Sequence, residues 1–519
     1  MVSSNNGILT AAQPYDDLQQ GSPEERRVFE SLQERLVVQF RDIFPDPSRE
    51  RCIVVVPSLS VDTDLLLRIT GFHHYEERML FMLMLLRLPR TRLIYVTSQP
   101  IDPLIIDYYL HLLSGIPTSH ARERLTLLSC HDSSSRPLAE KVLERPLLLE
   151  RIRTAVGDQM VAHLTVFNAT RLELTLSVKL GIPLYACDPI LTDLGSKSGS
   201  REIFAEADVD MPPGFENLRD EVDITDALTA LRVEHPYLKK AVVKMNEGFG
   251  GEGNAVFSYA GAPSGTGLGA WITAELPNRL QFEATDETWE NYSHKFSEMS
   301  GVVEGWISGE PKRSPSVQCL VDPLGEVNLV STHDQSLGGP SSQIYEGCTF
   351  PADEEYSHAI QQSAYRIAEI LCLRGVKGRF GVDFVSIRES GLWKHYAIEI
   401  NLRKGGTTHP FLMLQYLTHG VYDHERLRYY TPTGQERYYR SSDDLRKEVL
   451  KGLTPHDLID LAVFNRLHFD AATQQGVVFH LLGAMSEFGK IGILCIGDSH
   501  DEARHLFDRT IDTLESREG

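Results

Sequence analysis

The sequence predicts an open parallel α/β domain at the N-terminus, a β-rich body after it, and a small α+β domain at the C-terminus. Short apolar strand patterns alternate with helical patterns up to about residue 190, which is typical of a parallel sheet covered by helices. Strand patterns separated by long loops then continue to about residue 425. With 519 residues, 42% of them hydrophobic, the chain is long enough for several domains with their own cores.

The first domain is expected to span residues 23–189, after a polar tail at residues 1–22. Its first helix is predicted at residues 23–44, where Val28, Leu32, Leu36 and Phe40 recur every fourth residue on one face. Strands are then predicted at 52–56, 93–97, 125–129, 164–167 and 184–186, and helices at 75–88, 103–113 and 172–180. No glycine-rich phosphate turn follows these strands in the sequence, so we expect a substrate or scaffold layer rather than a nucleotide site.

The β-rich body is expected to span residues 190–425, and the C-terminal domain residues 426–519. Residues 258–270 are rich in Gly and Ser and are predicted to form a flexible insertion. In the C-terminal domain, strands are predicted at 476–482 and 491–496. A helix should follow them, with Ser499 and Glu502 as a capping box at its start.

Composition narrows the classes of function. The net charge of −21 argues against a general nucleic-acid binder, whose affinity depends on Lys and Arg neutralising phosphates, but it allows a local basic pocket for ATP. None of the seven cysteines forms a Cys-x-x-Cys pair, so no zinc site is expected, and their odd number suggests reduced thiols in a cytosol.

Nothing in the sequence suggests a membrane partner. The first residues lack the basic-then-apolar order of a signal peptide, and we therefore expect a cytoplasmic protein. The strongest apolar run, residues 79–86, is far shorter than the roughly 20 residues that span a bilayer. A buried helix is the favoured interpretation of this run. A dimer face is the alternative, so the sequence leaves a homodimer open.

A glycine-rich loop at residues 246–254 follows an apolar run that ends in Lys244 and precedes a second apolar run. The pattern predicts two strands joined by a loop whose backbone N–H groups can approach an anion. A flexible hairpin with Lys244 on the surface explains the pattern equally well when it is taken alone. The loop is neither a Walker A sequence nor a dinucleotide fingerprint, because no Gly-Lys-Ser/Thr follows it and a strand rather than a helix comes next.

Three further clusters give this loop a context. Lys197 precedes a predicted helix that ends near residue 207, and an apolar strand ends in two carboxylates, Glu304 and Glu310. Asp383 lies within one apolar strand, whereas Glu399 and Asn401 lie two residues apart in another and therefore share a face. Half-buried carboxylates need a counter-ion, and magnesium prefers one or two of them together with phosphates and water. An ordinary strand-end charge at Glu304 and a solvent-exposed Lys197 remain the alternatives.

This order of motifs resembles the ATP-grasp superfamily over roughly residues 190–425. The resemblance implies an ATP-grasp fold with ATP and Mg²⁺ as cofactors, and it assigns roles residue by residue. It makes Lys197 and Lys244 phosphate contacts, Glu304 and the Ile307 backbone adenine contacts, and Glu310 the acceptor of a ribose hydroxyl. It makes Gly248, Gly250, Gly251, Gly253 and Asn254 a lid over the phosphates, and Asp383, Glu399 and Asn401 magnesium ligands.

A closer likeness concerns residues 333–352, 399–410, 479–490 and 495–499, which resemble the corresponding segments of pheganomycin-type peptide ligases. On this basis residues 23–189 would be a pre-ATP-grasp domain in front of the ATP-grasp body. The activity implied is an ATP-dependent carboxylate–amine ligase that forms a peptide or peptide-like amide through an acyl phosphate. Its partners would be small-molecule or peptide carboxylates and amines, which the sequence does not name.

The same likeness suggests catalytic and substrate residues. Arg379 and Arg403 are the expected donors to a tetrahedral oxyanion, with Arg403 favoured because it follows Asn401, and Lys404 is included as a catalytic candidate. The expected substrate residues are His333, Gln335, Thr407, Thr408 and His409, although His409 is also explained as a residue that begins a helix before Pro410. A carboxylate kinase or carboxylase on the same fold, and a non-catalytic ATP-binding module, are the competing functions.

Overall fold

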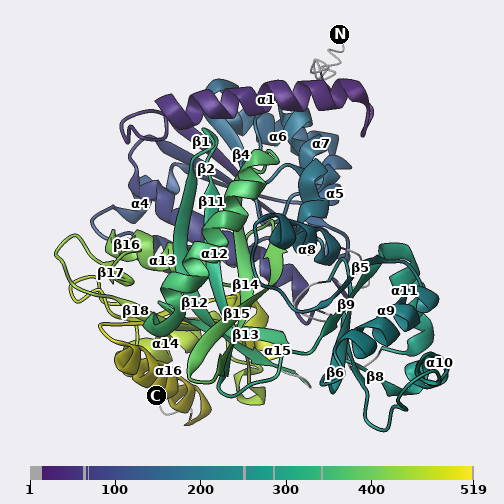
Figure 1. Ribbon diagram of the computed structural model, residues 1–519. Coiled ribbons are helices and arrows are strands. Elements are labelled where there is room, and N and C mark those ends of the chain that lie inside the picture. The colour runs from purple at the N-terminus through teal and green to yellow at the C-terminus, as the bar shows by residue number, and fades with distance from the viewer. Residues whose placement is uncertain are drawn as a thin grey trace, which may run out of the picture.

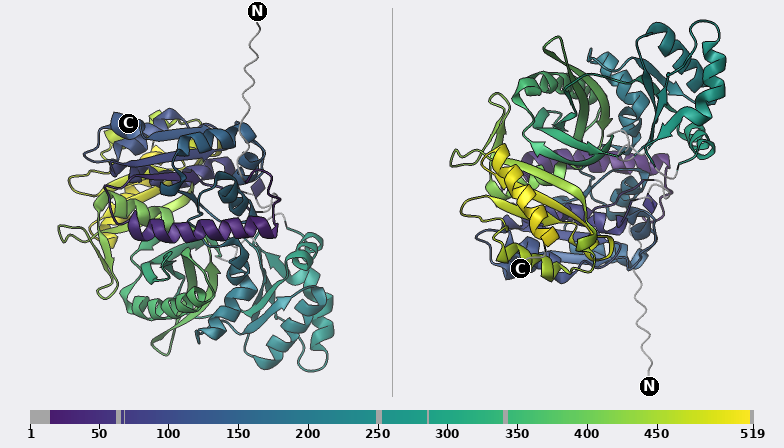
Figure 2. Two further views of the ribbon diagram at one scale, coloured as in Figure 1. Left: turned by 90° about the horizontal axis from the view of Figure 1, so that it is seen from above. Right: turned by 90° about the horizontal axis from the view of Figure 1, so that it is seen from below.

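The computed structural model describes residues 15–61, 66–67, 69–248, 253–284, 287–339 and 343–516. Figure 1 shows a large body and a smaller lobe, built around β5 to β9, that projects to one side of it. Both views of Figure 2 show the same projection. No helix of the described residues has both the length and the hydropathy needed to cross a bilayer.

The N-terminal part contains a parallel sheet, as predicted, and the order of its strands is β3-β2-β1-β4. Alternating strands and helices build it because each buried strand is followed by a segment that covers a face of the sheet. The predicted strand at 184–186 is reduced to a single bridge between Leu164 and Leu184. The elements of this part are α1 (Pro23–Asp42), β1 (Arg51–Val56), η1 (Phe72–Arg87), β2 (Thr91–Thr97), α3 (Pro103–His111), α4 (Thr118–Arg122), β3 (Leu125–Ser129), α5 (Leu138–Leu143), α6 (Pro146–Val156), η2 (Gln159–Val161), β4 (Ala162–Val166), α7 (Arg171–Leu180) and η3 (Pro189–Gly195).

The apolar run at residues 79–86 lies in the helix η1, which is a 3₁₀ helix rather than the ordinary helix expected at 75–88. Met79, Leu80, Phe81 and Leu83 are each at most 2% exposed and belong to a core shared with the C-terminal part. The helix packs between β2 and α13 (Thr408–Thr418). The buried interpretation of this run is therefore confirmed.

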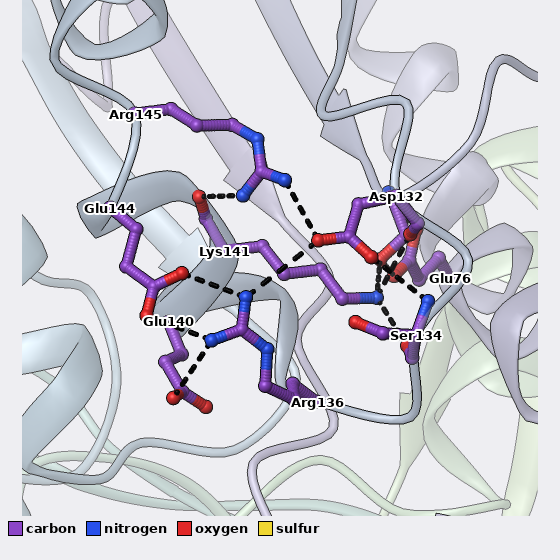
Figure 3. Close-up of polar contacts among 9 residues, drawn as sticks. Glu76, Asp132, Ser134, Arg136, Glu140, Lys141, Glu144 and Arg145 are labelled. Carbon is purple, nitrogen blue, oxygen red and sulfur yellow. Dashed lines mark hydrogen bonds and ion pairs between the residues drawn. The ribbon is translucent and has the colours of Figure 1, made fainter.

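A buried polar network fills the C-terminal end of β2 (Figure 3). The fully buried ammonium of Lys141 donates to the Ser98 hydroxyl at 3.0 Å and to the carbonyls of Asp132 and Ser134 at 3.0 and 2.6 Å. The amide and hydroxyl of Ser98 in turn donate to the Glu76 carboxylate, both at 2.6 Å. Protein groups thus satisfy one another at an edge where open parallel sheets often bind ligands. This arrangement suits a scaffold layer.

The small lobe is an antiparallel sheet in the order β5-β9-β6-β7-β8 with helices on one face. Strands β6 and β7 are joined by the glycine-rich loop, as the sequence predicts, with Lys244 opposite Asn254. Helix α10 begins at Leu268, inside the stretch predicted to be a flexible insertion. Helix α8 (Lys197–Glu206) precedes the lobe and packs chiefly on the body, against η3 and β15 (Leu392–Asn401). The elements of the lobe are β5 (Gly214–Leu218), α9 (Glu221–Glu234), β6 (Lys240–Met245), β7 (Asn254–Ser258), α10 (Leu268–Arg279), β8 (Leu280–Phe282), α11 (Trp289–Met299) and β9 (Gly301–Gly305).

The large sheet has the order β10-β14-β11-β12-β13-β18-β20-β19, and β15 pairs with β14. Helix α12 packs on β11 and β12 (Figure 1). The elements are β10 (Lys312–Arg313), β11 (Pro315–Val321), β12 (Val327–Gly338), β13 (Ile344–Phe350), α12 (Glu354–Leu373), β14 (Gly378–Glu389), β15 (Leu392–Asn401), β16 (Val421–Asp423), β17 (Arg428–Tyr430), β18 (Tyr438–Arg446), η4 (Glu448–Leu450), α14 (Pro455–Phe464), β19 (Gly476–His480), η5 (Leu482–Ala484), α15 (Met485–Phe488), β20 (Lys490–Gly497) and α16 (His500–Ser516).

The C-terminal strands β18, β19 and β20 continue this large sheet instead of forming a sheet of their own. Their apolar side chains share one core with the N-terminal part, as Ile53, Tyr95, Val477 and Ile493 illustrate. At the start of α16 the Ser499 hydroxyl accepts from the Glu502 amide at 3.2 Å, which is one half of the predicted capping box. The proposed domain boundaries near residues 190 and 425 remain a prediction.

Candidate active site

A cavity of about 300 Å³ lies where the small lobe, the large sheet and η1 meet. Its wall combines apolar surface with convergent charged groups, which is the usual composition of a small-molecule site. Eleven of the residues predicted from the sequence line it: Lys197, Lys244, Asn254, Glu304, Ile307, Gln335, Asp383, Glu399, Asn401, Arg403 and Thr407. The structure therefore brings together motifs that lie up to two hundred residues apart.

The predicted metal ligands sit on two neighbouring antiparallel strands. Asp383 of β14 lies directly opposite Glu399 of β15, and Gly381 lies opposite Asn401. The Asn401 amide donates to Asp383 Oδ2 at 3.0 Å, and the Gln335 amide donates to Asp383 Oδ1 at 2.9 Å. The alternation of a β-strand thus delivers Glu399 and Asn401 to the same face, as expected.

The electrostatics of this pair fit a divalent cation. Burial and the neighbouring charge of Glu399 raise the pKa of Asp383 to about 6. Burial also acts to raise the pKa of Glu399, but the ammonium of Lys197 outweighs it, so that this pKa is lowered. Two adjacent carboxylates and an amide oxygen are ligands that Mg²⁺ accepts, and a cation would relieve the repulsion that raises the Asp383 pKa.

Lys197 is the first residue of α8, where Ser196 caps the helix by accepting from the Gly199 amide at 3.0 Å. Its side chain is buried rather than solvent-exposed, and its ammonium lies 2.5 Å from Glu399 Oε1. Glycine is required at 199, because a Cβ there would lie 2.0 Å from the Asp193 carbonyl oxygen. The tight turn before α8 therefore holds Lys197 against the carboxylate of Glu399.

Lys244 and Glu304 form a second buried ion pair. The Lys244 ammonium lies 2.6 Å from Glu304 Oε2, and the Arg201 guanidinium lies 2.9 Å from Glu304 Oε1. Burial works against the charge of Glu304, but the two cations prevail and lower its pKa. Glu304 is thus no ordinary strand-end charge, since it sits on the cavity wall between two buried cations.

The glycine-rich loop is described at its two ends. A Cβ at Gly248 would lie 3.6 Å from the Gly253 Cα, so these ends run beside each other. Asn254 lines the cavity and donates to the Gln343 side chain at 2.9 Å, which links the hairpin to the large sheet. Gly250 and Gly251 lie outside the described residues.

The three predicted catalytic residues lie in different parts of the structure. Arg403 lies on the wall of the cavity, just after Asn401, whose carbonyl accepts from the Arg403 amide at 2.7 Å. Lys404 points the other way, as its ammonium donates to the Val166 carbonyl at 2.5 Å. Arg379 faces a second cavity behind the first. Of these three candidates, Arg403 is therefore the one that lies next to the predicted metal ligands.

Two predicted nucleotide contacts differ in position. Ile307 lines the cavity beside Trp306, whose ring lies 4.3 Å from the Lys312 ammonium. Glu310 is exposed and does not contribute to the wall. The strand that carries Glu304 ends at Gly305, so the chain that follows turns outward before Glu310 is reached.

The predicted substrate residues also lie in different parts of the structure. Gln335 and Thr407 line the cavity, whereas Thr408 and His409 line a small void next to it. His333 lies in the core and bonds the Tyr439 hydroxyl at 2.8 Å, and burial lowers its pKa to about 3. The structure therefore gives His333 a packing position rather than a place at the cavity, because β12 turns that face toward Phe350 and Phe411.

Sequence reasoning missed several wall residues. Arg78 of η1 and Asp443 of β18 meet across the cavity at 2.5 Å, although 365 positions separate them in the chain. Tyr345 packs on Gly406, where a Cβ would lie 2.3 Å from the tyrosine ring. Arg201 does not line the cavity, but it pairs with the wall residue Glu304, and its position four residues after Lys197 is the sequence signal for it.

This chain is similar to known protein families and to known proteins. Residues 190–260 and 272–425 match the family described as IQCH-like, ATP-grasp, and residues 457–510 match the family described as PGM1 C-terminal domain. The L-propargylglycine–L-glutamate ligase of Streptantibioticus cattleyicolor is 31% identical over 436 residues, which cover 82% of this chain and 86% of that protein. The chain belongs to the ATP-grasp superfamily.

One further relative of this ATP-grasp protein and one solved structure with a similar fold show how far the likeness extends. IQ motif-containing protein H of Danio rerio is 23% identical over 541 aligned positions, which cover 94% of this chain but 50% of that protein. The biotin carboxylase domain of Hydrogenobacter thermophilus 2-oxoglutarate carboxylase, solved with MgADP, ADP and bicarbonate, has a TM-score of 0.52. The two sequences are 12% identical, and the match covers 89% of this chain and 90% of the chain in that structure, which shows a shared fold.

Proposed function

We propose that this protein is an ATP- and magnesium-dependent carboxylate–amine ligase that forms a peptide or peptide-like amide bond through an acyl phosphate. The observation that carries the proposal is the convergence of two lysines, two carboxylates, an asparagine and an arginine on one cavity wall. A nucleotide sensor has no need for paired carboxylates beside a buried lysine. The relative named for joining two amino acids supports an amide-forming ligase.

In this proposal Lys197 and Lys244 bind the phosphates of ATP, and Asn254 with the glycine-rich loop covers them. Asp383, Glu399 and Asn401 would hold Mg²⁺, which when bound supplies charge neutralisation for phosphoryl transfer. Both lysines are held at carboxylates in the structure, Lys197 by Glu399 and Lys244 by Glu304. Entering phosphates would therefore compete for ammonium groups that are already positioned and largely desolvated.

The acceptor step makes different demands on the site. Attack of an amine on the acyl phosphate creates a tetrahedral oxyanion, and Arg403 is the cation beside the metal-site residues that can donate to it. An acyl phosphate hydrolyses if water reaches it, so closure of the glycine-rich loop would protect it. Glu304, Ile307 and Glu310 are proposed for the adenosine part, and Gln335, Thr407, Thr408 and His409 for the substrates, with Glu310 the weakest because it is exposed.

The proposal also covers the domains of the chain and the location of the protein. We propose a pre-ATP-grasp domain at residues 23–189, an ATP-grasp body at 190–425 and a small C-terminal domain at 426–519, in a protein related to pheganomycin-type peptide ligases. The match of residues 457–510 to the PGM1 C-terminal domain supports this arrangement. All seven cysteines lie in the described residues as free thiols, which supports a cytosolic location.

The test is an ATP-to-ADP assay with magnesium and a panel of amino acids and short peptides, followed by mass spectrometry of the products. A ligase gives ADP and a condensed product whose mass equals the two substrates less one water. ADP formation with bicarbonate and no condensed product would indicate a carboxylase, and tight ATP binding without turnover on any acceptor would indicate a binding module.

A further inference from the structure

A second cavity of about 300 Å³ lies between the N-terminal sheet and the large sheet. It adjoins the first cavity at Phe167 and Arg403, which line both. Much of its wall is apolar, with Met82 and Leu320 among the contributors, and positive charge comes from Arg379 and Lys404 together with Arg51 and Arg403. Among the described residues that line it there is no aspartate or glutamate.

Arg379 is the unusual group in this wall. Its Nη1 atom is buried and has no hydrogen-bond partner among the described residues. Burial lowers its pKa, and the neighbours that oppose this effect are the phenols of Tyr185 and Tyr416 and the thiol of Cys319 rather than a carboxylate. A guanidinium with a buried, unpartnered N–H group and no carboxylate on the described wall around it is costly, so the fold maintains this charge against a free-energy penalty.

Lys404 adds a second cation to the same wall. Its ammonium donates to the Val166 carbonyl at 2.5 Å and to the Thr165 hydroxyl at 3.4 Å, both neutral groups of β4. Burial and the charge of Arg379 lower its pKa to about 8. Arg379 and Lys404 repel each other, and one anion bound beside both would stabilise these two of the cations on the wall.

The position of Arg379 along β14 indicates which carboxylate of a substrate it can bind. Arg379 and Asp383 lie on the same face of β14, four residues apart, which is about 13 Å at the rise of a β-strand. A carboxylate held by Arg379 is therefore not the carboxylate that is phosphorylated beside Asp383 and Glu399. A substrate that carries it can still reach the first cavity past Arg403, which borders both cavities.

We propose that the second cavity binds an amino acid or short-peptide substrate through a carboxylate that does not react, with Arg379 as its direct partner and Lys404 beside it. The inference rests on the proposed ligase function and names the part of the substrate that this cavity recognises. The apolar wall would accept the hydrocarbon part of the same molecule, and Arg379 would be a binding residue rather than an oxyanion donor.

The experiment measures binding by calorimetry on the full-length protein, with the standard amino acids and a set of dipeptides, each beside its C-terminal carboxamide. Wild type should bind at least one carboxylate at least about 10-fold more tightly than its amide, because charge-assisted hydrogen bonds to a buried guanidinium are lost. In Arg379→Met that preference should disappear, while the affinity for ATP with magnesium stays within about 2-fold of wild type.

Thermal unfolding provides a readout that does not depend on finding the substrate. Arg379→Met removes an uncompensated buried charge, so the ligand-free variant should unfold at a higher temperature than wild type. Arg124→Met is the matched control. The Arg124 guanidinium donates to the carbonyls of Leu88 and Thr91 at 2.8 and 2.9 Å, so its loss should lower the unfolding temperature and leave substrate binding unchanged.

Three results would overturn the inference. These are equal binding of every carboxylate and its amide, unchanged carboxylate binding by Arg379→Met, or tighter binding of inorganic phosphate than of any amino acid or dipeptide. Trapping of acyl phosphates as hydroxamates by wild type keeps the two proposals apart. Hydroxamate formation together with any of these three results would reject the second site alone, whereas no hydroxamate with any carboxylate would reject the ligase function.

Discussion

Asp383 and Glu399 stand directly opposite each other on the antiparallel strands β14 and β15. Like charges at opposed positions of two strands destabilise a sheet, and burial makes the repulsion stronger. Lys197 neutralises part of it through its contact with Glu399 at 2.5 Å. Burial and the remaining repulsion from Glu399 raise the pKa of Asp383 to about 6. A divalent cation bound beside this pair would relieve the repulsion.

The first prediction concerns pH. Asp383 must lose its proton to bind a metal, and its pKa of about 6 in the folded protein exceeds the ordinary value of 3.8. The affinity for ATP with magnesium should therefore fall as the pH is lowered through 6, by up to about 10-fold per pH unit. Titrations with ATP and magnesium between about pH 5 and pH 8 measure this. Asp383→Asn should bind weakly at every pH, and a wild-type affinity that is flat across this range would contradict the assignment.

The raised pKa also affects the ligand-free protein. Because the folded state holds the Asp383 proton more tightly than the unfolded state, this group costs stability above its folded pKa and the cost disappears as the pH falls from about 6 toward 4. The loss at neutral pH is on the order of 3 kcal/mol. Adding magnesium with ATP at neutral pH should recover it as a rise in unfolding temperature that Asp383→Asn does not show.

The second prediction concerns Lys244. Lys244→Met should lower ATP turnover at least about 100-fold, because a phosphate contact is lost. It should also destabilise the fold by about 2–4 kcal/mol, since Glu304 keeps only Arg201 as a partner. The double variant Lys244→Met with Glu304→Gln should recover stability but not turnover. Lys240→Met is the control, because Lys240 lies on the same strand and is exposed. Turnover retained by Lys244→Met would remove Lys244 from the site.

The third prediction compares two adjacent glycines. A Cβ at Gly406 would lie 2.3 Å from a ring carbon of Tyr345 on the cavity wall, whereas a Cβ at Gly405 would meet nothing within 4 Å. Gly406→Ala should therefore cost about 1–3 kcal/mol of stability and raise the KM for the substrates, because the ring or the loop must move. Gly405→Ala should stay within about 0.5 kcal/mol of wild type. Equal behaviour of the two variants in denaturant unfolding and steady-state kinetics would contradict this packing.

The fourth prediction concerns the network of Figure 3. Lys141→Met leaves the acceptors at Ser98, Asp132 and Ser134 without their donor. A loss of about 3 kcal/mol in the free energy of unfolding is expected, with little change in the affinity for ATP. Lys451→Met is the control, since Lys451 is exposed and pairs with Glu448 within one helical turn, which contributes well under about 1 kcal/mol. A Lys141→Met protein as stable as wild type would refute the buried role.

Local patterns predicted much of the site because the chemistry follows strand alternation. Glu399 and Asn401 share a face for that reason, and Lys404 turns away because the strand ends at Asn401. The same argument could not place Arg379. It shares the Asp383 face of β14, but the packing of the N-terminal sheet divides the space along that strand into two cavities.

Other features depend on contacts that no local pattern contains. Arg78 and Asp443 meet only because η1 packs against the C-terminal strands, and no sequence motif joins them. The helix η1 is apolar on nearly every side because it is buried between layers, so its periodicity could not distinguish a 3₁₀ helix from an ordinary one. The continuation of the large sheet through β18, β20 and β19 is likewise a tertiary pairing.

Isotope transfer tests the central claim most directly. The wild-type protein is incubated with ATP, magnesium and a pool of amino acids and dipeptides labelled with ¹⁸O in their carboxylates, and the released phosphate is examined by mass spectrometry. An acyl phosphate leaves one carboxylate oxygen on that phosphate, so the ligase account predicts ¹⁸O-labelled phosphate, ADP and a condensed amide in equal amounts. Unlabelled phosphate alongside the amide, or AMP with pyrophosphate, would contradict it.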